Sequence, residues 1–425
     1  MAPMAVDPER PSVLFLSQAL PYPADSGGKQ RTFHVLRELE KGFRVHLLAF
    51  HRRHHQADPQ AVADARAALG EVVTHVYRPI PMRSEWSMAA RGWDHLRSVI
   101  SGRAYSYYQY AGRRFEAAFR HALDHSKPKL IHFDSIDFHR WFLEGPESVQ
   151  TCTHHDIESD LLARRAGTYR NPALSRYVAL QARRMRKVEE AYAPRFHLNL
   201  TMSPVDTHRL RSIAPDAPVL EVPNAVSLED FLLDPATSEE PDTVVFVGPT
   251  YLFANRDAVE YLLGDIWPGV REAHPTARLL LVGRNASGEP ERFARIPGVE
   301  PLGRVPDVRP VLRRAACSVI PIRVGGGTRI KLLESWAMGR AVVTTSLGAE
   351  GLSAEDGVNA MIRDDPRGFA EAVAQVLKDA AKRRALGRAG RRTVETAYSW
   401  ERVGERLRAA YREMVQSPSG SKAAP

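Results

Sequence analysis

The sequence predicts an α/β protein built from two doubly wound domains. Short apolar runs bounded by turn residues alternate with segments of helical period along almost the whole chain, which is typical of parallel sheets covered by helices. The chain has 425 residues, a length that favours two or three domains. Each half also opens with an apolar strand that leads into a glycine-bearing turn, at residues 27–28 and at Gly248.

Each expected element follows from its local pattern. In the first half, apolar runs predict strands at residues 12–16, 44–49, 72–76, 130–133, 149–153, 198–202 and 219–222. Helical period between them predicts helices at residues 29–40, 57–69, 113–124 and 174–191. In the second half we expect strands at residues 244–247, 279–282, 299–302, 318–320 and 341–344. Helices are expected there at residues 257–263, 308–315, 328–338 and 369–378.

A change in composition at residues 227–242 divides the chain. This stretch loses its periodicity and collects Asp, Glu, Pro, Ser and Thr, which is typical of a linker. We therefore predict one domain at residues 11–226 and a second at residues 243–398, with the ligand site in the cleft between them. A helix at residues 399–415 can pack back on the first domain, and the tail at residues 416–425 is expected to be disordered.

Composition excludes several classes of protein. Apolar residues make up 44% and charged residues 26% of the chain, which argues against wholesale disorder, a collagen-like repeat or a coiled coil. The formal charge of +9 favours an anionic partner, which can be nucleic acid, a membrane surface or a phosphorylated small substrate. Cys152 and Cys317 lie in apolar runs, so neither a disulfide framework nor a thiolate metal site is expected. No apolar run approaches the roughly 20 residues of a membrane span, so we expect a cytoplasmic location.

The most informative stretch is a glycine-rich segment in the second half. A strand is expected to end at Pro321 and a helix to open at Thr328. Three successive glycines lie between them: Gly325, Gly326 and Gly327. Glycines let the backbone approach a ligand closely, and the free N–H groups at a helix start attract an anion.

Charged side chains surround this segment. Arg323, Arg329 and Lys331 bring three cations into one turn, and Thr328 can cap the helix or contact a ligand, so the charge fits a diphosphate. Glu334 lies about one and a half turns further on. A carboxylate repels phosphate, so we predict that it accepts hydrogen bonds from the hydroxyls of a ribose. The alternative is a glycine turn followed by a Lys–Glu pair on a solvated helix face.

A second polar segment, residues 151–159, follows a predicted strand and precedes a helix. Such residues lie at the carboxyl ends of parallel strands, where α/β proteins bind ligands. His155 is suited to accept or orient a proton near neutral pH, although helix capping is the alternative. Further candidates at this edge are His154, Asp156 and Glu158, with Asp134, Ser135 and Asp137 after the preceding strand as possible acceptor contacts. A metal site is not expected from this cluster.

Taken together, these motifs resemble the glycosyltransferases of the two-domain GT-B architecture, in particular the retaining group 1, or family 4, enzymes. In the second half the resemblance rests on residues 245–248, 255–258, 281–283, 303–308, 325–334 and 348–352. In the first half it rests on residues 23–28, with weaker matches at residues 155–158 and 222–226. The resemblance implies two Rossmann-like domains that face a central cleft.

The resemblance also implies a role for individual residues toward a nucleotide-diphosphate sugar. The segment from Gly325 to Lys331 would hold the diphosphate, and Glu334 the ribose. Residues implied to line the rest of the donor site are Arg304 and Val305 at the base, Gly248 and Asn255 after the second domain's first strand, and Gly27 and Gly28 from the first domain. His155 corresponds to the histidine of the catalytic site. Neither a metal nor another cofactor is implied.

The sequence departs from the family pattern at two places. The family signature has two glutamates eight positions apart, and Gly326 stands where the first is expected. The usual Arg and Lys after the second domain's first strand are also missing from residues 249–254. We hypothesise that Arg323, Arg329 and Lys331 supply this charge from the opposite loop.

The implied reaction moves a hexosyl group to a hydroxyl of a saccharide or lipid-linked acceptor, with retention of configuration, in polysaccharide or glycoconjugate biosynthesis. Arg329 and Lys331 would stabilise the charge that develops on the leaving diphosphate. A nucleotide-sugar epimerase and a non-catalytic nucleotide-binding protein are the alternatives. Basic runs at residues 164–165, 183–187 and 391–392 can meet a membrane from its cytoplasmic face. They lack the interleaved aromatic residues of a nucleic-acid site.

Overall fold

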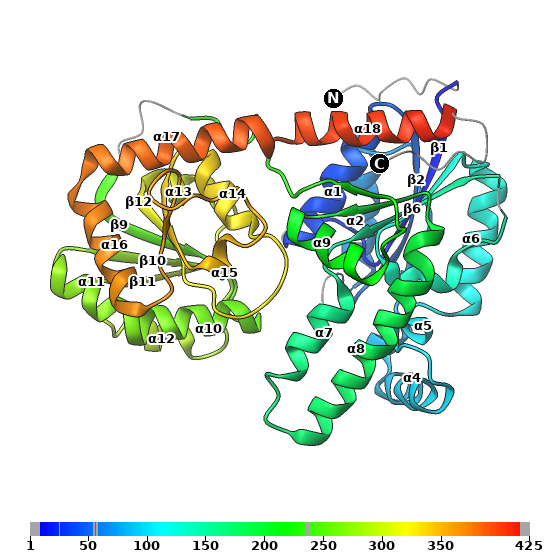
Figure 1. The fold of residues 1–425 in the computed structure, drawn as a ribbon, viewed down its shortest axis with the longest axis horizontal. Helices are drawn as coiled ribbons and strands as arrows, with labels where there is room; N and C mark the ends of the chain where they lie inside the picture. Colours follow the sequence, from blue (N-terminus) through cyan, green and yellow to red (C-terminus); the bar gives the residue numbers. More distant parts are fainter. Residues whose placement is uncertain are drawn as a thin grey trace. The chain divides into compact units, whose positions relative to one another are not determined.

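The chain forms two compact units, each built around a parallel sheet with helices packed on it (Figure 1). The structure is a computed structural model that describes residues 9–24, 26–53, 56, 58–145, 147–233 and 239–416. Unit 1 runs to Pro223 and includes the chain from Gly404 onward, and unit 2 is Asn224–Val403. The predicted α/β class is confirmed.

Unit 1 holds a parallel sheet of order β3-β2-β1-β5-β6-β7-β8, with β4 paired to β2. Its strands are β1 (Ser12–Ser17), β2 (Arg44–His51), β3 (His75–Val76), β4 (Ile80–Pro81), β5 (Leu130–Phe133), β6 (Val149–His154), β7 (Leu198–Thr201) and β8 (Val219–Glu221). Every residue of β1 and β5 is buried. This double-sided burial explains why these strands read as continuous apolar runs in the sequence.

The helices of unit 1 pack on this sheet or on one another. They are α1 (Gly27–Glu40), α2 (Pro59–Gly70), α3 (Arg83–Trp86), α4 (Met88–Ser101), α5 (Ser106–Gln109), α6 (Arg113–Ser126), η1 (Ile136–Trp141), α7 (Glu158–Ala166), α8 (Pro172–Tyr192), η2 (Ala193–Arg195), α9 (Pro204–Ile213) and most of α18 (Trp400–Gln416). Asp58, Asn171 and Ser203 cap α2, α8 and α9 through their side chains, and a proline follows each of them. Helix α18 contacts α1 through an Arg408–Glu38 ion pair.

Unit 2 holds a parallel sheet of order β11-β10-β9-β12-β13-β14. Its strands are β9 (Glu240–Val247), β10 (Arg278–Val282), β11 (Val299–Gly303), β12 (Ala315–Ile320), β13 (Ala341–Thr344) and β14 (Met361–Ile362). Its helices are α10 (Phe253–Tyr261), the π-helical turn η3 (Leu262–Ile266), α11 (Trp267–Ala273), α12 (Glu289–Phe293), α13 (Arg309–Arg314), α14 (Ile330–Ala337), α15 (Ser346–Ala349), α16 (Pro366–Lys378) and α17 (Ala380–Ala397).

Two local expectations differ from the structure. Residues 240–242 of the predicted linker instead begin β9, where Glu240 accepts a hydrogen bond from Arg314 Nε at 2.7 Å. The strand expected at residues 72–76 is reduced to β3, because the backbone N–H groups of Val72 and Val73 bond to the carbonyl of Leu69 at the end of α2. Residues 234–238 of the linker and 417–425 of the expected tail lie outside the described residues.

The strand order places a change of direction at the same point in each sheet. In unit 1, β1 lies between β2 and β5, and in unit 2, β9 lies between β10 and β12. The chain therefore winds outward to both sides of the first strand of each sheet. In such sheets, ligands bind beyond the carboxyl ends of the strands at this point. The loops that follow β9 and β12, and those that follow β1 and β5, are the places to look for a site.

Candidate functional site

The glycine-rich segment of unit 2 follows β12 and leads into α14. Gly325 has φ 116° and Gly327 has φ 73°, both in the region that favours glycine. Helix α14 begins at Ile330, and Arg329 at its N-cap position makes no capping bond with its side chain. The backbone N–H groups of the first turn are thus left without a side-chain cap, which suits an anion.

Thr328 does not cap this helix, so that expectation is wrong. The helix starts two residues later than predicted, because Arg329 is the last residue with extended backbone, at φ −90° and ψ 96°. The Thr328 hydroxyl instead accepts a hydrogen bond from Asn224 Nδ2 at 2.6 Å. Sequence reasoning missed Asn224, although it lies in the weakly matching segment at residues 222–226. Its only signal was that resemblance, since the two residues are 104 positions apart.

Three predicted residues meet beside the glycine segment. Lys331 Nζ donates a hydrogen bond to Asn255 Oδ1 at 2.8 Å, and Asn255 Nδ2 donates to the Pro249 carbonyl at 3.1 Å. A Cβ added at Gly248 would lie 2.8 Å from Lys331 Nζ and 2.8 Å from Asn255 Cγ. Gly248 therefore leaves room for the lysine and the amide, and no larger residue fits without moving them.

The environment of Lys331 changes its acidity. Burial is the main cause that lowers the pKa of this ammonium to about 7, and the nearby Arg329 acts in the same direction. Glu334 partly opposes this effect. The ammonium also lies 4.5 Å from the centroid of the Phe246 ring. An anion bound next to Lys331 would stabilise the ammonium and raise this pKa again.

The two arginines of the segment have different surroundings. Arg323 Nη2 and Nε donate to the carboxylate of Asp257 at 2.9 and 3.2 Å, and its guanidinium carbon lies 4.0 Å from the centroid of the Tyr261 ring. Its charge is therefore balanced by α10. Arg329 Nη1 donates to the carbonyl of Gly326 and braces the glycine segment.

Three further residues of unit 2 are predicted to bind the donor, and their roles stay predictions. Glu334 lies on α14, only 9% exposed, and close enough to influence Lys331. Arg304 follows the edge strand β11 with an exposed side chain. Val305 packs against the core of unit 2.

In unit 1, His155 lies at the carboxyl edge of the sheet and contacts Asp134. His155 Nε2 and Asp134 Oδ1 are 3.1 Å apart, and Thr32 Oγ1 donates to Asp134 Oδ2 at 2.8 Å. Burial opposes ionisation of Asp134, but His155 and the hydrogen bonds outweigh it and lower the pKa of this carboxyl. The carboxylate thus holds the imidazole ring in one orientation.

Other predicted residues of unit 1 have structural surroundings. His154 Nε2 is 3.0 Å from Asn199 Oδ1, and burial lowers the pKa of His154 to about 4, so its ring is neutral. Gly27 and Gly28 form the first turn of α1 instead of the expected loop, because the chain turns into the helix directly after the extended Ser26.

Acidic residues also gather near this edge. Burial raises the pKa values of Asp137 and Glu158, and it raises that of Glu189 to about 7. Across the described ranges, no group of three or more His, Cys, Asp or Glu residues is arranged to hold a metal ion.

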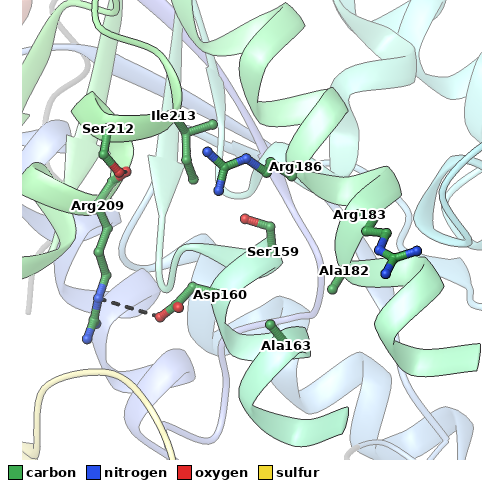
Figure 2. A pocket seen from close by; sticks show the side chains of 9 residues that line it. All are labelled: Ser159, Asp160, Ala163, Ala182, Arg183, Arg186, Arg209, Ser212 and Ile213. Atoms are coloured by element: carbon green, nitrogen blue, oxygen red, sulfur yellow. Dashed lines mark hydrogen bonds and ion pairs between the residues drawn. The ribbon is translucent and has the colours of Figure 1, made fainter. Parts of the chain in front are cut away.

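A separate hollow of about 220 Å³ lies between α7, α8 and α9 (Figure 2). Arg183, Arg186 and Arg209 line it together with Asp160, and Arg209 Nε lies 3.5 Å from the Asp160 carboxylate (Figure 2). None of the predicted site residues is among the described residues that line this hollow. It is therefore distinct from both candidate sites.

Comparison with known proteins identifies the family that this architecture resembles. Residues 241–379, which include the glycine segment and Lys331, match the family described as glycosyl transferases group 1. This part of the chain is similar to the group 1 glycosyltransferases. The resemblance predicted from the motifs is thereby confirmed.

Among these glycosyltransferase relatives is the GDP-mannose-dependent monoacylated alpha-(1-6)-phosphatidylinositol monomannoside mannosyltransferase of Corynebacterium glutamicum. It is 29% identical over 225 residues, an alignment that covers 47% of this chain and 58% of the relative. The aligned part therefore spans less than two thirds of that protein.

Solved structures show that the fold is GT-B. Sucrose-phosphate synthase from Thermosynechococcus elongatus has a TM-score of 0.67 at 17% identity, over 95% of this chain and 99% of that chain. Anabaena HepE in complex with UDP-glucose has a TM-score of 0.62 at 12% identity, over 95% and 100%. WaaG, a glycosyltransferase involved in lipopolysaccharide biosynthesis, has a TM-score of 0.61 at 13% identity, over 94% and 99%.

Proposed function

We propose that this protein transfers a hexosyl group from a nucleotide-diphosphate sugar to a hydroxyl acceptor, with retention of configuration. The observation that carries the proposal is the junction of Gly248, Asn255 and Lys331 beside an uncapped helix start. This junction places a buried cation beside a helix start without a side-chain cap, at the ligand-binding edge of the unit 2 sheet.

In this proposal, the donor diphosphate binds at the N-terminus of α14. As the glycosidic bond breaks, negative charge grows on the leaving diphosphate. The N–H groups at the start of α14, Lys331 and Arg329 stabilise that charge more than they stabilise the intact donor. The surroundings of Lys331 are poorly solvated, which strengthens its attraction for the diphosphate. A front-face path assisted by the leaving group requires no nucleophile from the protein.

The nucleoside binds to residues next to the N-terminus of α14. Glu334 accepts hydrogen bonds from the ribose hydroxyls. Arg304 and Val305 lie beside the base. Gly326 replaces the family's first glutamate, so contacts with the donor sugar differ from the usual pattern. The names of the relatives support two donors as probes: GDP-mannose, used by the corynebacterial enzyme, and UDP-glucose, bound to HepE. No metal takes part in the proposed reaction.

In this proposal, His155 binds the acceptor hydroxyl. Asp134 holds the ring of His155 at the carboxyl edge of the unit 1 sheet, where the imidazole can orient a sugar hydroxyl. Two relatives are named for work on lipid-linked glycans, a phosphatidylinositol mannoside and lipopolysaccharide. We therefore include a saccharide or lipid-linked acceptor, with the protein at the cytoplasmic face of a membrane. No helix among the described residues is long and apolar enough to span a bilayer.

Turnover assays test this function. The protein is incubated with UDP-glucose or GDP-mannose and a pool of glycan and glycolipid acceptors, and the released nucleoside diphosphate and new glycoside are measured. Acceptor-dependent release supports transfer. Sugar isomerised without an acceptor would instead indicate an epimerase, and tight binding without turnover would indicate a non-catalytic protein. Glu334→Ala should weaken nucleotide binding and turnover together.

A further inference from the structure

Helix α4 of unit 1 has its polar side buried and its apolar side exposed. Asp94 and Ser98 are 1% and 0% exposed. The most exposed apolar residues on the helix are Met88 (85%), Ile100 (75%), Trp93 (55%), Val99 (48%) and Leu96 (47%). At about 100° per residue, these five cover an arc of about 140° on one side of the helix. An ordinary surface helix has the opposite orientation.

The buried polar side fixes this orientation. Asp94 accepts a hydrogen bond from Arg83 Nη2 at 2.6 Å. Ser98 Oγ donates to the Arg103 carbonyl at 2.8 Å and accepts from Gln181 Nε2 of α8 at 3.0 Å. His95 Nδ1 lies 2.6 Å from the hydroxyl of Tyr177, which also lies on α8. Rolling α4 to bury its apolar side would break these bonds and leave Asp94 uncompensated.

Helix α4 lies at the periphery of unit 1, beside α8 and α5 (Figure 1). The exposed apolar residues lie on one side of a single helix, and an apolar surface of this kind marks a binding site. We name the surface formed by Met88, Trp93, Leu96, Val99 and Ile100 the α4 face.

Arginines border the α4 face. Arg91 and Arg97 are exposed and stand on either side of the apolar arc. Residues 83–103 hold four arginines against two acids, and one of those acids, Asp94, is buried and paired. Tryptophan beside aliphatic residues, with arginine at the edges, is the pattern of helices that lie in the interface of a bilayer. This charge favours an anionic lipid surface over a second copy of the same basic face.

We propose that the α4 face docks the protein on a membrane that contains anionic phospholipid. The apolar side chains enter the boundary between headgroups and acyl chains, and Arg91 and Arg97 contact lipid phosphates. This proposal adds a membrane as a partner in the proposed function. It rests on that function only for the idea that the acceptor is lipid-linked. The surface differs from the basic runs at residues 183–187 and 391–392 that the sequence suggested.

Vesicle binding tests the docking. The full chain is sedimented with vesicles of phosphatidylcholine alone or with added phosphatidylglycerol. We expect the wild type to bind the anionic vesicles and to bind them less at high salt, which screens the attraction between arginines and lipid phosphates. Leu96→Ser with Ile100→Ser should weaken this binding at least about tenfold. Arg91→Gln with Arg97→Gln should weaken it at low salt and have little effect at high salt. The matched control, Leu232→Ser with Leu233→Ser, removes two leucines that are 64% and 50% exposed in unit 2 and should bind as the wild type does.

Two results would overturn the proposal. One is equal vesicle binding by the wild type and by the Leu96→Ser, Ile100→Ser variant when circular dichroism shows both to be folded. The other is absence of binding by the wild type to the anionic vesicles. If the wild type is then a dimer that this variant abolishes, the α4 face binds a second copy instead. Donor binding in solution is measured on the same variants, so loss of the proposed function and loss of docking are distinguished.

Discussion

Replacing Lys331 by Gln tests whether a desolvated ammonium binds the donor diphosphate. In the free protein, burial and Arg329 lower the pKa of Lys331 to about 7. Above pH 7 the free site is mostly neutral, so a diphosphate that pairs with the ammonium must bind together with a proton. Well below pH 7 the site is already charged, and binding takes up no proton.

The size of the effect follows from this linkage. Donor affinity should be constant below about pH 6 and fall by about tenfold between pH 6 and pH 8, which corresponds to about 1.4 kcal/mol. Lys331→Gln should bind the donor weakly and without this pH dependence, and its turnover should fall by roughly 100–1,000-fold. Lys331→Arg keeps its charge at all these pH values, so its affinity should also be independent of pH.

Calorimetric titration with UDP-glucose and GDP-mannose provides the measurement, because the diphosphate of a nucleotide sugar does not titrate in this range. Repeating each titration in buffers of different ionisation enthalpy counts the protons taken up. The control Lys378→Gln removes an exposed lysine at the end of α16 and should keep the wild-type profile. Equal wild-type affinities at pH 6 and pH 8, or tight binding by Lys331→Gln, would refute this reasoning.

Three further substitutions test other parts of the account. His155→Ala should lower turnover while donor binding, measured by calorimetry, is retained; unchanged turnover would remove His155 from the catalytic site. Gly390→Ala should destabilise the protein by about 1–3 kcal/mol in urea unfolding, since its Cβ would lie 2.2 Å from Trp336 Cδ1. The control Gly92→Ala, whose Cβ meets nothing within 4 Å, should not destabilise, and equal losses would contradict the packing argument. Burial, together with the nearby His75 and His125, lowers the pKa of His46 to about 4. The free energy of unfolding of the wild type, compared with that of His46→Leu, should therefore fall by up to about 3 kcal/mol between pH 6.5 and pH 4. Parallel curves of stability against pH for the two proteins would exclude this cause.

The features predictable from the sequence were those that depend on neighbours along the chain. Strands such as β5 stand out because they are buried on both faces. The glycine segment, Lys331 and Glu334 could be placed on a loop and helix because turn chemistry and helical period are local. The start of α14 was displaced by two residues, since Arg329 keeps an extended backbone that its identity does not reveal.

The partners of the site residues could not be predicted, because they come from distant parts of the chain. Asn224 and Thr328 are 104 positions apart, and Arg323 and Asp257 are 66 apart. The sequence gives no means of telling which carboxylate pairs with which arginine, so the pairing of Arg323 with Asp257 could not be predicted.

Two unpredicted helices show how tertiary contacts override local signals. Glycines weaken the helical signal of α17, yet Gly390 is needed there because Trp336 packs directly against its backbone. Helix α4 has a clear apolar side, but its outward orientation depends on the buried bonds of Asp94 and Ser98. Periodicity alone would have placed that side in the core.

A crystal structure with a bound nucleotide sugar tests the central claim most directly. We predict diphosphate oxygens within hydrogen-bond distance of the backbone N–H groups at the start of α14 and of Lys331 Nζ, with the ribose hydroxyls donating hydrogen bonds to Glu334. A nucleotide sugar bound elsewhere, with Lys331 still paired only to Asn255, would contradict it.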